Sequence, residues 1–396
     1  MTDKMLQFID VEQAMPEKRA ANARRKDFEE IYAQFDEKGA EEQASRCSQC
    51  GVPYCQIHCP LSNNIPDWLR LTAEGRLEEA YELSSATNNM PEICGRICPQ
   101  DRLCEGNCVI EKDFSSVTIG SVEKYITDTA WHNGWIKPVK PVNEREQSVG
   151  VIGAGPAGLA AAEELRKQGF QVHIYDRYDR AGGLLVYGIP SFKLEKDVVG
   201  RRIQHRIDSG IVFHMEFEVG SDGTFDDLRE KHDALLIATG VYKSRGLKAP
   251  GIDLNNIEEA LDYLTVSNRH GFGDEIQGTS TFDVMDKNVV VVGGGDTAMD
   301  CVRTAVRQGA KSVKCLYRRD RDNMPGSIRE VHNAEEEGVE FVWLSGPESF
   351  LGSDKVEAVR AYRMKLGAPD ITGRQAPEPI PNSSFEMPCA LAIMAL

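Results

Sequence analysis

The 396-residue sequence predicts an α/β protein in which a helical N-terminal domain precedes two Rossmann-like dinucleotide-binding domains. Three observations support this fold class: eight of the 11 cysteines lie between Cys47 and Cys108, one glycine-rich turn begins at Gly153, and another begins at Gly293. Each turn stands between an apolar strand and a helix, which is the pattern of a unit that binds a dinucleotide. At roughly 100–200 residues per domain, the length fits two or three domains.

The composition is that of an ordinary globular chain and excludes several classes of partner. Hydrophobic residues make up 41% of the sequence, and the net charge is −16. Because nucleic acid and anionic membrane surfaces attract basic proteins, we expect no nucleic acid partner and no membrane partner. The N-terminal segment lacks a signal core, and no apolar run reaches the ~20 residues of a membrane span. We therefore expect a cytoplasmic protein whose clustered cysteines bind metal rather than form disulfides.

The segments around the cysteines are predicted to be helical. Residues 18–35 space their apolar side chains as a helix does, and we expect this helix to dock the N-terminus by packing. Residues 63–89 fit two short helices separated near Gly75, with Trp68 and Leu69 among the side chains of a small core. The cysteines should then lie on loops around helices.

The intervals between the cysteines favour iron–sulfur clusters over zinc. A structural zinc site commonly uses two C-x2-C pairs, and only Cys47 and Cys50 form such a pair here. Cys59 and Cys98 are each followed by proline, as in ferredoxin-like sequences, where the last cysteine of a run binds the other cluster. Eight thiolates suffice for two [4Fe-4S] clusters, and zinc remains the alternative. The predicted metal ligands are Cys47, Cys50, Cys55, Cys59, Cys94, Cys98, Cys104 and Cys108.

A linker rich in proline and charge, residues 133–147, leads to the first glycine turn. The predicted strand 149–152 ends at this turn, and an Ala/Leu-rich helix follows it. Gly153 makes the tight turn, Gly155 lets the backbone approach a pyrophosphate, and Gly158 lets helix and strand pack closely. The N-terminus of the helix then faces the phosphate charge. These features predict a dinucleotide site.

The second glycine turn repeats the arrangement 140 residues later. Residues 287–292 form the predicted strand, residues 293–298 the turn, and residues 299–308 the helix. Cys301 and Cys315 lie in this second module and are most simply core residues. A second dinucleotide site is therefore predicted.

The residue that follows the second strand differs between the two modules. In the first module, strand 172–175 ends in Asp176, whose carboxylate can accept hydrogen bonds from ribose hydroxyls and would repel a 2′-phosphate. In the second module, strand 312–317 ends in Arg318 and Arg319. Arginine donates paired, charge-assisted hydrogen bonds to phosphate, so the second site should prefer NADPH to NADH. A solvated surface pair is the alternative for these two arginines.

Seven segments carry a resemblance to a known family: RCSQCGVPYCQIHCP, EICGRICPQDRLCEGNCV, VIGAGPAGLAAAEEL, AGGLLVYGIPSFKLEK, ALLIATGVY, VVGGGDTAMDCVRTAVRQGA and CLYRRDRDNMPGS. They resemble the small (beta) subunits of bacterial NADPH-dependent glutamate synthase, and the likeness runs from residue 5 to about residue 395. Dihydropyrimidine dehydrogenase and the bifurcating ferredoxin reductases share parts of the pattern.

The resemblance implies that the first turn binds FAD and the second NADPH. The residues implied for FAD are Gly153, Gly155, Pro156, Ala157, Gly158, Asp176, Gly182, Gly183, Leu184, Thr239 and Gly240. Those implied for NADPH are Gly293, Gly294, Gly295, Asp296, Thr297, Arg318 and Arg319. It also implies interleaved cluster ligands, with Cys108 joining Cys47, Cys50 and Cys55, and with Cys59, Cys94, Cys98 and Cys104 forming the other set.

The implied function is electron input to glutamate synthase. NADPH would be oxidised through FAD, and two [4Fe-4S] clusters would pass the electrons to a large (alpha) subunit that makes glutamate from glutamine and 2-oxoglutarate. The cofactors carry this chemistry, so no catalytic side chain is predicted. Two alternatives remain: a stand-alone NADPH oxidoreductase with a ferredoxin-type acceptor, and an inactive truncated form.

The predicted domains follow the same resemblance. They are a helical iron–sulfur domain (1–145), the first segment of an FAD domain (146–280), an NADPH domain (281–384) inserted in it, and the start of the returning FAD segment (385–396). Relatives continue beyond this point, so we expect the chain to be truncated at its C-terminus.

Overall fold

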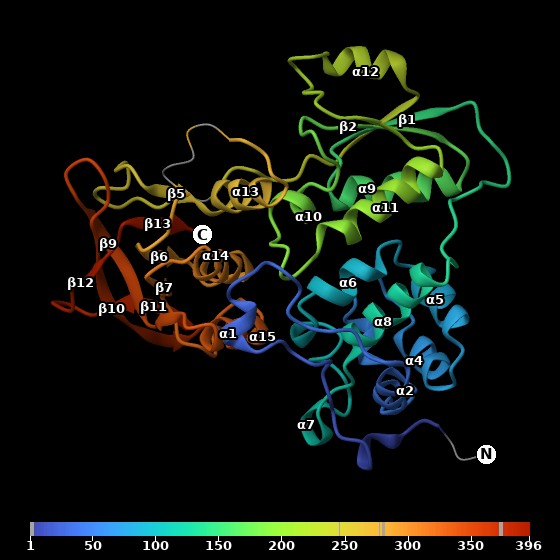
Figure 1. The fold of residues 1–396 in the computed structure, drawn as a ribbon, viewed down its shortest axis with the longest axis horizontal. Coiled ribbons are helices and arrows are strands. Elements are labelled where there is room, and N and C mark those ends of the chain that lie inside the picture. Colours follow the sequence, from blue (N-terminus) through green and yellow to red (C-terminus); the bar gives the residue numbers. More distant parts are fainter. Residues whose placement is uncertain (1–3, 245, 277, 279–281, 372–374) are drawn as a thin grey trace. The chain divides into compact units, whose positions relative to one another are not determined.

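The computed structural model describes residues 4–244, 246–276, 278, 282–371 and 375–396. The chain divides into two compact units (Figure 1). Unit 1 comprises Met1–Arg19, Glu30–Val186 and Ser191–Gly240, and unit 2 comprises Ala20–Glu29, Tyr187–Pro190 and Val241–Leu396. The helical region and the first glycine turn therefore share one unit, and the second glycine turn lies in the other.

The helical region of unit 1 surrounds a small apolar core. Trp68 is the largest side chain in this core, and its indole N–H donates to Asn63 Oδ1 at 2.8 Å. Gly75, at φ +77°, separates two of the helices as predicted. The helical elements are η1 (Gln7–Ile9), α2 (Glu37–Ser45), α3 (Tyr54–Ile57), α4 (Ile65–Ala73), α5 (Leu77–Ser85), α6 (Pro91–Ile97), η2 (Gln100–Arg102), α7 (Glu111–Phe114) and α8 (Ile119–His132).

The helix predicted for residues 18–35 is wrong, because only α1 (Ala21–Arg24) is helical there. The buried Arg24 explains the difference. Its side chain donates to Glu337 Oε1 at 2.8 Å and to Glu336 Oε2 at 2.6 Å, so α1 belongs to unit 2 and lies beside α15 (Ile328–Glu336), as Figure 1 shows. These long-range ion pairs favour an irregular path over the weak helical spacing of the local sequence.

A four-stranded parallel sheet with the order β3-β2-β1-β4 completes unit 1. In Figure 1, α9 and α11 lie on one side of this sheet and α12 lies on the other. The strand–turn–helix–strand prediction around the first glycine turn is confirmed. The elements are β1 (Ser148–Ile152), α9 (Pro156–Lys167), β2 (Gln171–Tyr175), α10 (Leu184–Tyr187), α11 (Lys196–Asp208), β3 (Val212–His214), α12 (Phe225–Lys231) and β4 (Ala234–Ile237).

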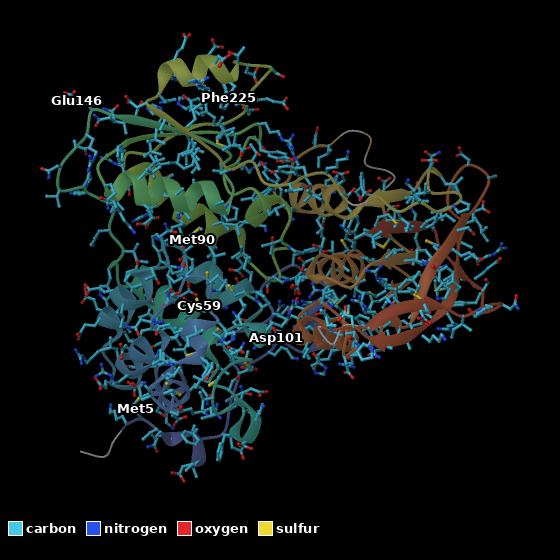
Figure 2. The ribbon with its side chains drawn as sticks, turned by 180° about the vertical axis from the view of Figure 1, so that it is seen from behind. Met5, Cys59, Met90, Asp101, Glu146 and Phe225 are labelled. Carbon is cyan, nitrogen blue, oxygen red and sulfur yellow. The ribbon has the colours of Figure 1, made fainter. Side chains whose placement is uncertain are left out.

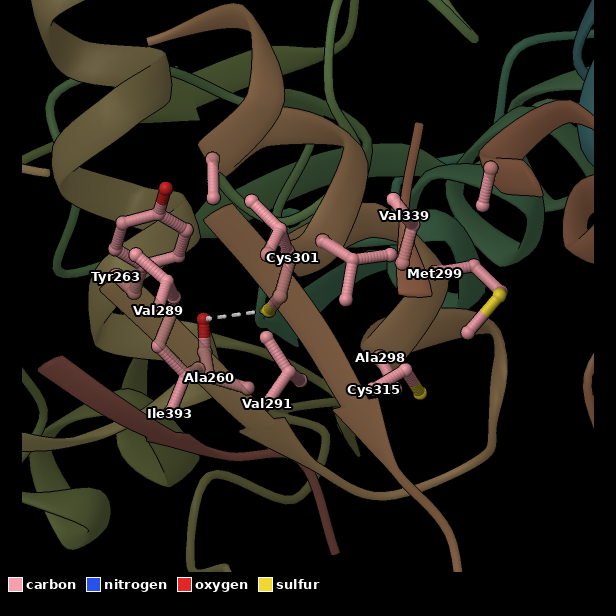
Figure 3. Close-up of a cluster of buried hydrophobic side chains, with 14 of the residues drawn as sticks. Ala260, Tyr263, Val289, Val291, Ala298, Met299, Cys301, Cys315, Val339 and Ile393 are labelled. Atoms are coloured by element: carbon pink, nitrogen blue, oxygen red, sulfur yellow. Dashed lines mark hydrogen bonds between the residues drawn. The ribbon is translucent and has the colours of Figure 1, made fainter. Parts of the chain in front are cut away.

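Unit 2 is built on a five-stranded parallel sheet with the order β5-β13-β6-β7-β8. Its core includes Tyr263, Val291 and both predicted core cysteines, Cys301 and Cys315, which are fully buried (Figure 3). The elements are β5 (Ile257–Glu259), α13 (Ala260–Gly271), β6 (Asn288–Val292), α14 (Asp296–Arg307), β7 (Ser312–Leu316), α15 (Ile328–Glu336), β8 (Glu340–Val342) and β13 (Leu391–Met394).

An antiparallel sheet in unit 2 shares a second apolar core with the parallel sheet. Its longest strand, β10, pairs with each of the other three. The strands are β9 (Ser345–Leu351), β10 (Ala358–Pro369), β11 (Gln375–Pro379) and β12 (Phe385–Pro388).

Two predicted domain boundaries need correction. The sheet of the second module already begins with β5 at Ile257, before the predicted boundary at residue 280. Residues 385–396 do not begin a return to the first sheet, because β13 pairs with β5 and β6 of the second sheet. All four residues of β13 are buried, as expected for a central strand of a parallel sheet covered on both faces. Within the described residues, no helix combines the length and apolarity that a membrane span requires.

Candidate functional site

The first glycine turn has the backbone geometry of a dinucleotide cradle. Gly153 adopts φ +113°, and a Cβ added there would lie 2.4 Å from the carbonyl oxygen of Ala238. A Cβ on Gly158 would lie 2.0 Å from Gly153 O, so the first turn of α9 packs directly on the loop. A Cβ on Gly155 would meet nothing within 4 Å. The loop is therefore packed at Gly153 and Gly158 and open at Gly155, where a pyrophosphate could approach the N-terminus of α9.

The other residues implied for FAD gather around the same turn. Gly182 N donates to Ala154 O at 2.8 Å, and a Cβ on Gly183 would lie 2.8 Å from Gly155 Cα. Leu184, at the start of α10, is exposed. Thr239 and Gly240 follow β4, where the backbone at Thr239 borders Gly153. The space at Gly155 is thus bordered by the Gly182–Gly183 segment. Pro156 and Ala157 form the first turn of α9.

Asp176 follows β2 as predicted, and its carboxylate also braces the glycine loop. Oδ2 accepts a hydrogen bond from Ala154 N at 2.6 Å, and Oδ1 accepts one from Tyr178 N at 2.9 Å. Each carboxylate oxygen can accept more than one hydrogen bond, so these contacts leave capacity for ribose hydroxyls.

The second glycine turn repeats this plan with different packing. A Cβ on Gly293 (φ +150°) would lie 2.1 Å from Ala395 O, and one on Gly294 would lie 2.3 Å from the ring of Tyr317. A Cβ on Gly295 would meet nothing within 4 Å, as at Gly155. The position that corresponds to Gly158 is occupied by the buried Ala298. Both turns are therefore packed at the first glycine and open at the N-cap of the helix.

The segment that follows β7 folds back onto the second turn. Gly326 N donates to Gly294 O at 2.9 Å, and Ser327 N donates to Asp296 Oδ1 at 2.9 Å. Thr297 is exposed in the first turn of α14. The Asp296 side chain therefore helps to hold the segment after β7 against the second glycine turn.

Arg318 and Arg319 lie at the start of that segment. Arg318 is exposed, and Arg319 is half-buried with its Nε shielded from solvent and without a hydrogen-bond partner. A buried guanidinium N–H that lacks an acceptor costs free energy, and a phosphate oxygen is the kind of group that would satisfy it. The donor set therefore fits the phosphate of NADPH.

Four thiols of the N-terminal region form one interacting set, which we call the first thiol set: Cys47, Cys50, Cys55 and Cys108. Burial, with further contributions from Cys108 and Cys50, raises the pKa of the Cys47 thiol to about 11. Burial, then Cys47, Cys108 and Cys50, raises the pKa of Cys55 to about 12. Such thiols stay protonated until a metal takes the place of the proton.

We call the other four cysteines of the N-terminal region the second thiol set: Cys59, Cys94, Cys98 and Cys104. Within it, Cys94 interacts with Cys98, and Cys104 interacts with Cys59. A hydrogen bond to Cys98 and then burial raise the pKa of Cys94, while burial, Glu105, Glu123 and Cys59 raise that of Cys104. Figure 2 labels Cys59 among the side chains of the helical region. The two sets have the interleaved composition that the family resemblance implies.

The thiols are not gathered as a single metal ion would require. Across the described residues, which include all 11 cysteines, no three His, Cys, Asp or Glu side chains converge as ligands of one ion, and no disulfide is present. Zinc holds its thiolates at about 2.3 Å in a closed tetrahedron. A [4Fe-4S] cluster takes four thiolates, and each set supplies four thiols.

Two side chains beside the thiols, those of Gln49 and Glu123, were not predicted. Gln49 Nε2 donates to Cys47 Sγ at 3.3 Å and to Pro66 O at 2.7 Å. Glu123 is buried next to Cys94, and burial raises the pKa of its carboxyl group well above the usual range. Cys94 lies in α6 and Glu123 in α8, so only the folded chain brings these two side chains together. His58, which lies beside Cys59, is exposed and contacts Tyr54 O.

Two family descriptions match the chain in tandem. Residues 24–135 match "dihydropyrimidine dehydrogenase domain II, 4Fe-4S cluster", and residues 147–368 match "pyridine nucleotide-disulphide oxidoreductase". The glutamate synthase [NADPH] small chain of Azospirillum brasilense is 65% identical over 99% of this chain and 82% of its own length. The chain belongs to the family of glutamate synthase [NADPH] small chains.

A more distant relative supports the same family, and a solved structure supports the fold. The small chain from Escherichia coli K12 is 46% identical over 100% of this chain and 84% of its own length. FprA of Mycobacterium tuberculosis, solved in complex with NADPH, matches 64% of this chain and 71% of its own, with 20% identity and a TM-score of 0.55. At that identity the structural match shows the fold alone, which is the predicted fold class.

Proposed function

We propose that this chain is the electron-input subunit of glutamate synthase, an NADPH-dependent flavin and iron–sulfur oxidoreductase. It would oxidise NADPH through FAD and deliver electrons through two [4Fe-4S] clusters to a large subunit that makes glutamate from glutamine and 2-oxoglutarate. The observation that carries this proposal is the combination of two open glycine turns with opposite charges after their second strands and eight thiols in two sets of four. Family membership supports the same function.

The nucleotide side of the proposal rests on the second turn. Gly295 leaves room for the pyrophosphate at the N-terminus of α14, where the helix dipole favours negative charge. Arg318 and Arg319 would donate to the 2′-phosphate and so select NADPH over NADH. The first turn would hold the FAD pyrophosphate at Gly155, and Asp176 would accept hydrogen bonds from the ribose. When bound, FAD takes up the electron pair of NADPH and passes single electrons to the clusters.

The thiol sets would hold one cluster each. Because Cys108 would complete the set of Cys47, Cys50 and Cys55, each cluster would cross-link segments that are far apart in the sequence. Metal binding to such buried thiols releases their protons and stabilises the fold around them. We therefore assign Cys47, Cys50, Cys55 and Cys108 to one cluster and Cys59, Cys94, Cys98 and Cys104 to the other.

The large subunit would dock at the helical region beside the first thiol set. Val52, Tyr54, Ile57 and Val109 are large apolar side chains that are 57%, 49%, 60% and 54% exposed. Val52 and Tyr54 lie between Cys50 and Cys55, and Val109 follows Cys108. Exposed apolar surface often marks a protein interface, so these four side chains are the proposed contact with the large subunit. A cytoplasmic location is proposed because thiols remain reduced there, which suits cluster assembly.

Reconstitution tests the proposed function directly. The chain would be purified anaerobically together with its large subunit, and glutamate formation from glutamine and 2-oxoglutarate would be followed with NADPH as the donor. We expect NADPH-dependent glutamate formation that is lost when this chain is omitted. Full NADPH oxidation with a ferredoxin-type acceptor, without any glutamate formation in the complex, would instead favour a stand-alone reductase.

A further inference from the structure

Helix α6 carries part of the second thiol set and is joined to the flavin-side helices by a buried ion pair. Cys94 lies within α6, and Cys98 caps its C-terminus. Two residues before Cys94, the fully buried Glu92 accepts two hydrogen bonds from Arg202 of α11. The Nε–Oε1 distance is 2.6 Å and the Nη2–Oε2 distance is 2.7 Å, which is the paired geometry of a guanidinium on a carboxylate.

A second contact, on the flat face of the guanidinium group, also holds the Arg202 side chain in place. Its side chain is 3% exposed, and Cζ lies 4.9 Å from the ring centroid of Trp131. Trp131 belongs to α8, which packs along α6. Glu92 binds the edge of the guanidinium, and Trp131 contacts its face. Together these two contacts restrict the orientation of α6 relative to α11.

Asn88 and Asn89, which precede the N-cap residue of α6, add a second connection. Asn89 Nδ2 donates to Ala160 O at 2.9 Å and to Glu164 Oε1 at 3.2 Å, and both acceptors lie on α9, the helix that begins at the first glycine turn. The neighbouring Asn88 Oδ1 accepts from Cys94 Sγ at 3.7 Å. Consecutive residues thus link the flavin-side helix α9 to a thiol of the second set.

The first thiol set is held by contacts within the helical region. Gln49 Nε2 donates to Cys47 Sγ at 3.3 Å, and Ser48 Oγ lies 2.9 Å from Cys50 Sγ. Arg46, which precedes this set, is fully buried and donates to the carbonyl oxygens of Val11 and Ser115. The polar connection to α9 and α11 therefore distinguishes the second set from the first.

We infer that Arg202 and Glu92 are positioning residues that fix α6, and with it the second thiol set, at the separation from the flavin-binding helices that the onward electron step requires. This inference rests on the proposed function. Replacing a buried ion pair by apolar side chains of similar size is often neutral for stability, so orientation is the property that this pair can supply. Electron transfer slows steeply with the separation of its centres, so orientation controls its rate. One NADPH supplies two electrons, one for each cluster, and its remaining proton goes to solvent.

Two variants separate positioning from simple structural support. Arg202→Lys keeps the charge opposite Glu92 but loses the paired hydrogen bonds and the planar contact with Trp131. The double variant Arg202→Met with Glu92→Met replaces the pair by apolar side chains and leaves no unpaired buried charge. Arg76→Met is the matched control, because Arg76 forms an exposed ion pair with Glu79 in the same unit.

The experiment mixes each anaerobic complex with NADPH and follows two steps. Loss of the flavin absorption band reports flavin reduction, and the paramagnetic resonance signal of the reduced clusters reports the onward step. We expect flavin reduction to stay within about twofold of the unmodified protein in both variants. Cluster reduction should slow by about tenfold or more, because small misplacements of reacting groups have large effects on rate. The signal of one cluster should shift while that of the other stays the same.

Other results would overturn the positioning role or the proposed function. Equal slowing of both steps, together with a lower unfolding temperature, would show that the pair only supports the fold. Unchanged cluster reduction in both variants would also overturn the positioning role. If the unmodified protein gives no flavin reduction by NADPH, the proposed function fails, whatever the variants do. Arg76→Met should leave both steps unchanged.

Discussion

The two glycine turns share one backbone plan and differ in the charge that follows the second strand. Both are packed at the first glycine and open at the helix N-cap, Gly155 in one turn and Gly295 in the other. The first module then places the carboxylate of Asp176 beside its loop, whereas the second places Arg318 and Arg319 after β7. If the two turns bind FAD and NADPH as proposed, the loops supply the same kind of pyrophosphate site, and the residues after the second strand select the dinucleotide.

The largest expected effect comes from removing the arginines. Charge-assisted hydrogen bonds contribute about 1.5–3 kcal/mol each, so Arg318→Ala with Arg319→Ala should raise the KM for NADPH by about 100-fold or more. The KM for NADH should change by only a few-fold, because NADH carries no 2′-phosphate. Steady-state kinetics with both nucleotides make the measurement. Equal losses for the two nucleotides would show that these arginines do not recognise the 2′-phosphate.

The next largest effect is expected from a substitution of Gly158, the third glycine of the first turn. Gly158→Ala would place Cβ 2.0 Å from Gly153 O, so the helix or the loop must move. We expect unit 1 to lose about 1–3 kcal/mol of stability and most of its flavin. Thermal unfolding and the flavin content of the purified protein measure both effects. The second module already carries alanine at this position, Ala298, so a harmless Gly158→Ala would mean that the two loops are interchangeable.

The open N-cap glycines offer a matched pair of milder changes. Gly155→Ala and Gly295→Ala each add a Cβ that meets nothing within 4 Å, so stability should change by no more than about 0.5 kcal/mol. Gly155→Ala should lower flavin affinity about tenfold without changing the KM for NADPH, and Gly295→Ala should do the reverse. Flavin content and NADPH kinetics, measured on both variants, test the assignment. A crossed result, with each variant affecting the other nucleotide, would exchange the two sites.

The smallest expected effect is on the pH dependence of stability, and it concerns the first module. His173, His214 and His232 gather around Tyr175, and burial, followed by the charge of Lys231 or of neighbouring histidines, lowers the pKa of all three imidazoles. Asp233 partly opposes the shift at His232.

The sign of the pH effect follows from these shifts. A histidine with a lowered pKa in the folded state binds its proton more readily when unfolded, so stability is complete above the ordinary pKa of about 6.5 and falls as the pH drops below it. We expect a lower unfolding temperature for unit 1 at acidic pH, and a smaller decrease in His173→Gln. An identical pH dependence in His173→Gln and the unmodified protein would assign the acid sensitivity to other groups.

Local patterns predicted much of this molecule. The strand–turn–helix units around Gly153 and Gly293 and the helix break at Gly75 follow from spacing within a few residues, and all of them are present. The predicted helix over residues 18–35 failed because Arg24 is bound by Glu337, more than 300 positions away in the chain. Strand β13 was assigned to the wrong sheet for a similar reason, since a buried apolar run does not specify its neighbours.

Some residues of the candidate site could be predicted from the sequence, and others could not. The cysteines and glycines carry their spacing in the sequence, whereas the positions of Glu123 and of the Glu92–Arg202 pair become visible only when helices pack together. The three histidines around Tyr175 come from separate strands and a loop, so no sequence window contains them. Local spacing in the sequence therefore predicts the candidate cofactor ligands, and it does not predict the buried side chains that lie beside them.

Anaerobic titration of the purified protein with NADPH and with NADH tests the proposed cofactors and the choice of nucleotide together. We expect NADPH to bleach the flavin band and then to give the signals of two reduced [4Fe-4S] clusters, and NADH to do so only at far higher concentration. Bleaching by both nucleotides with equal affinity, or a protein that contains zinc and no acid-labile sulfide, would contradict this expectation.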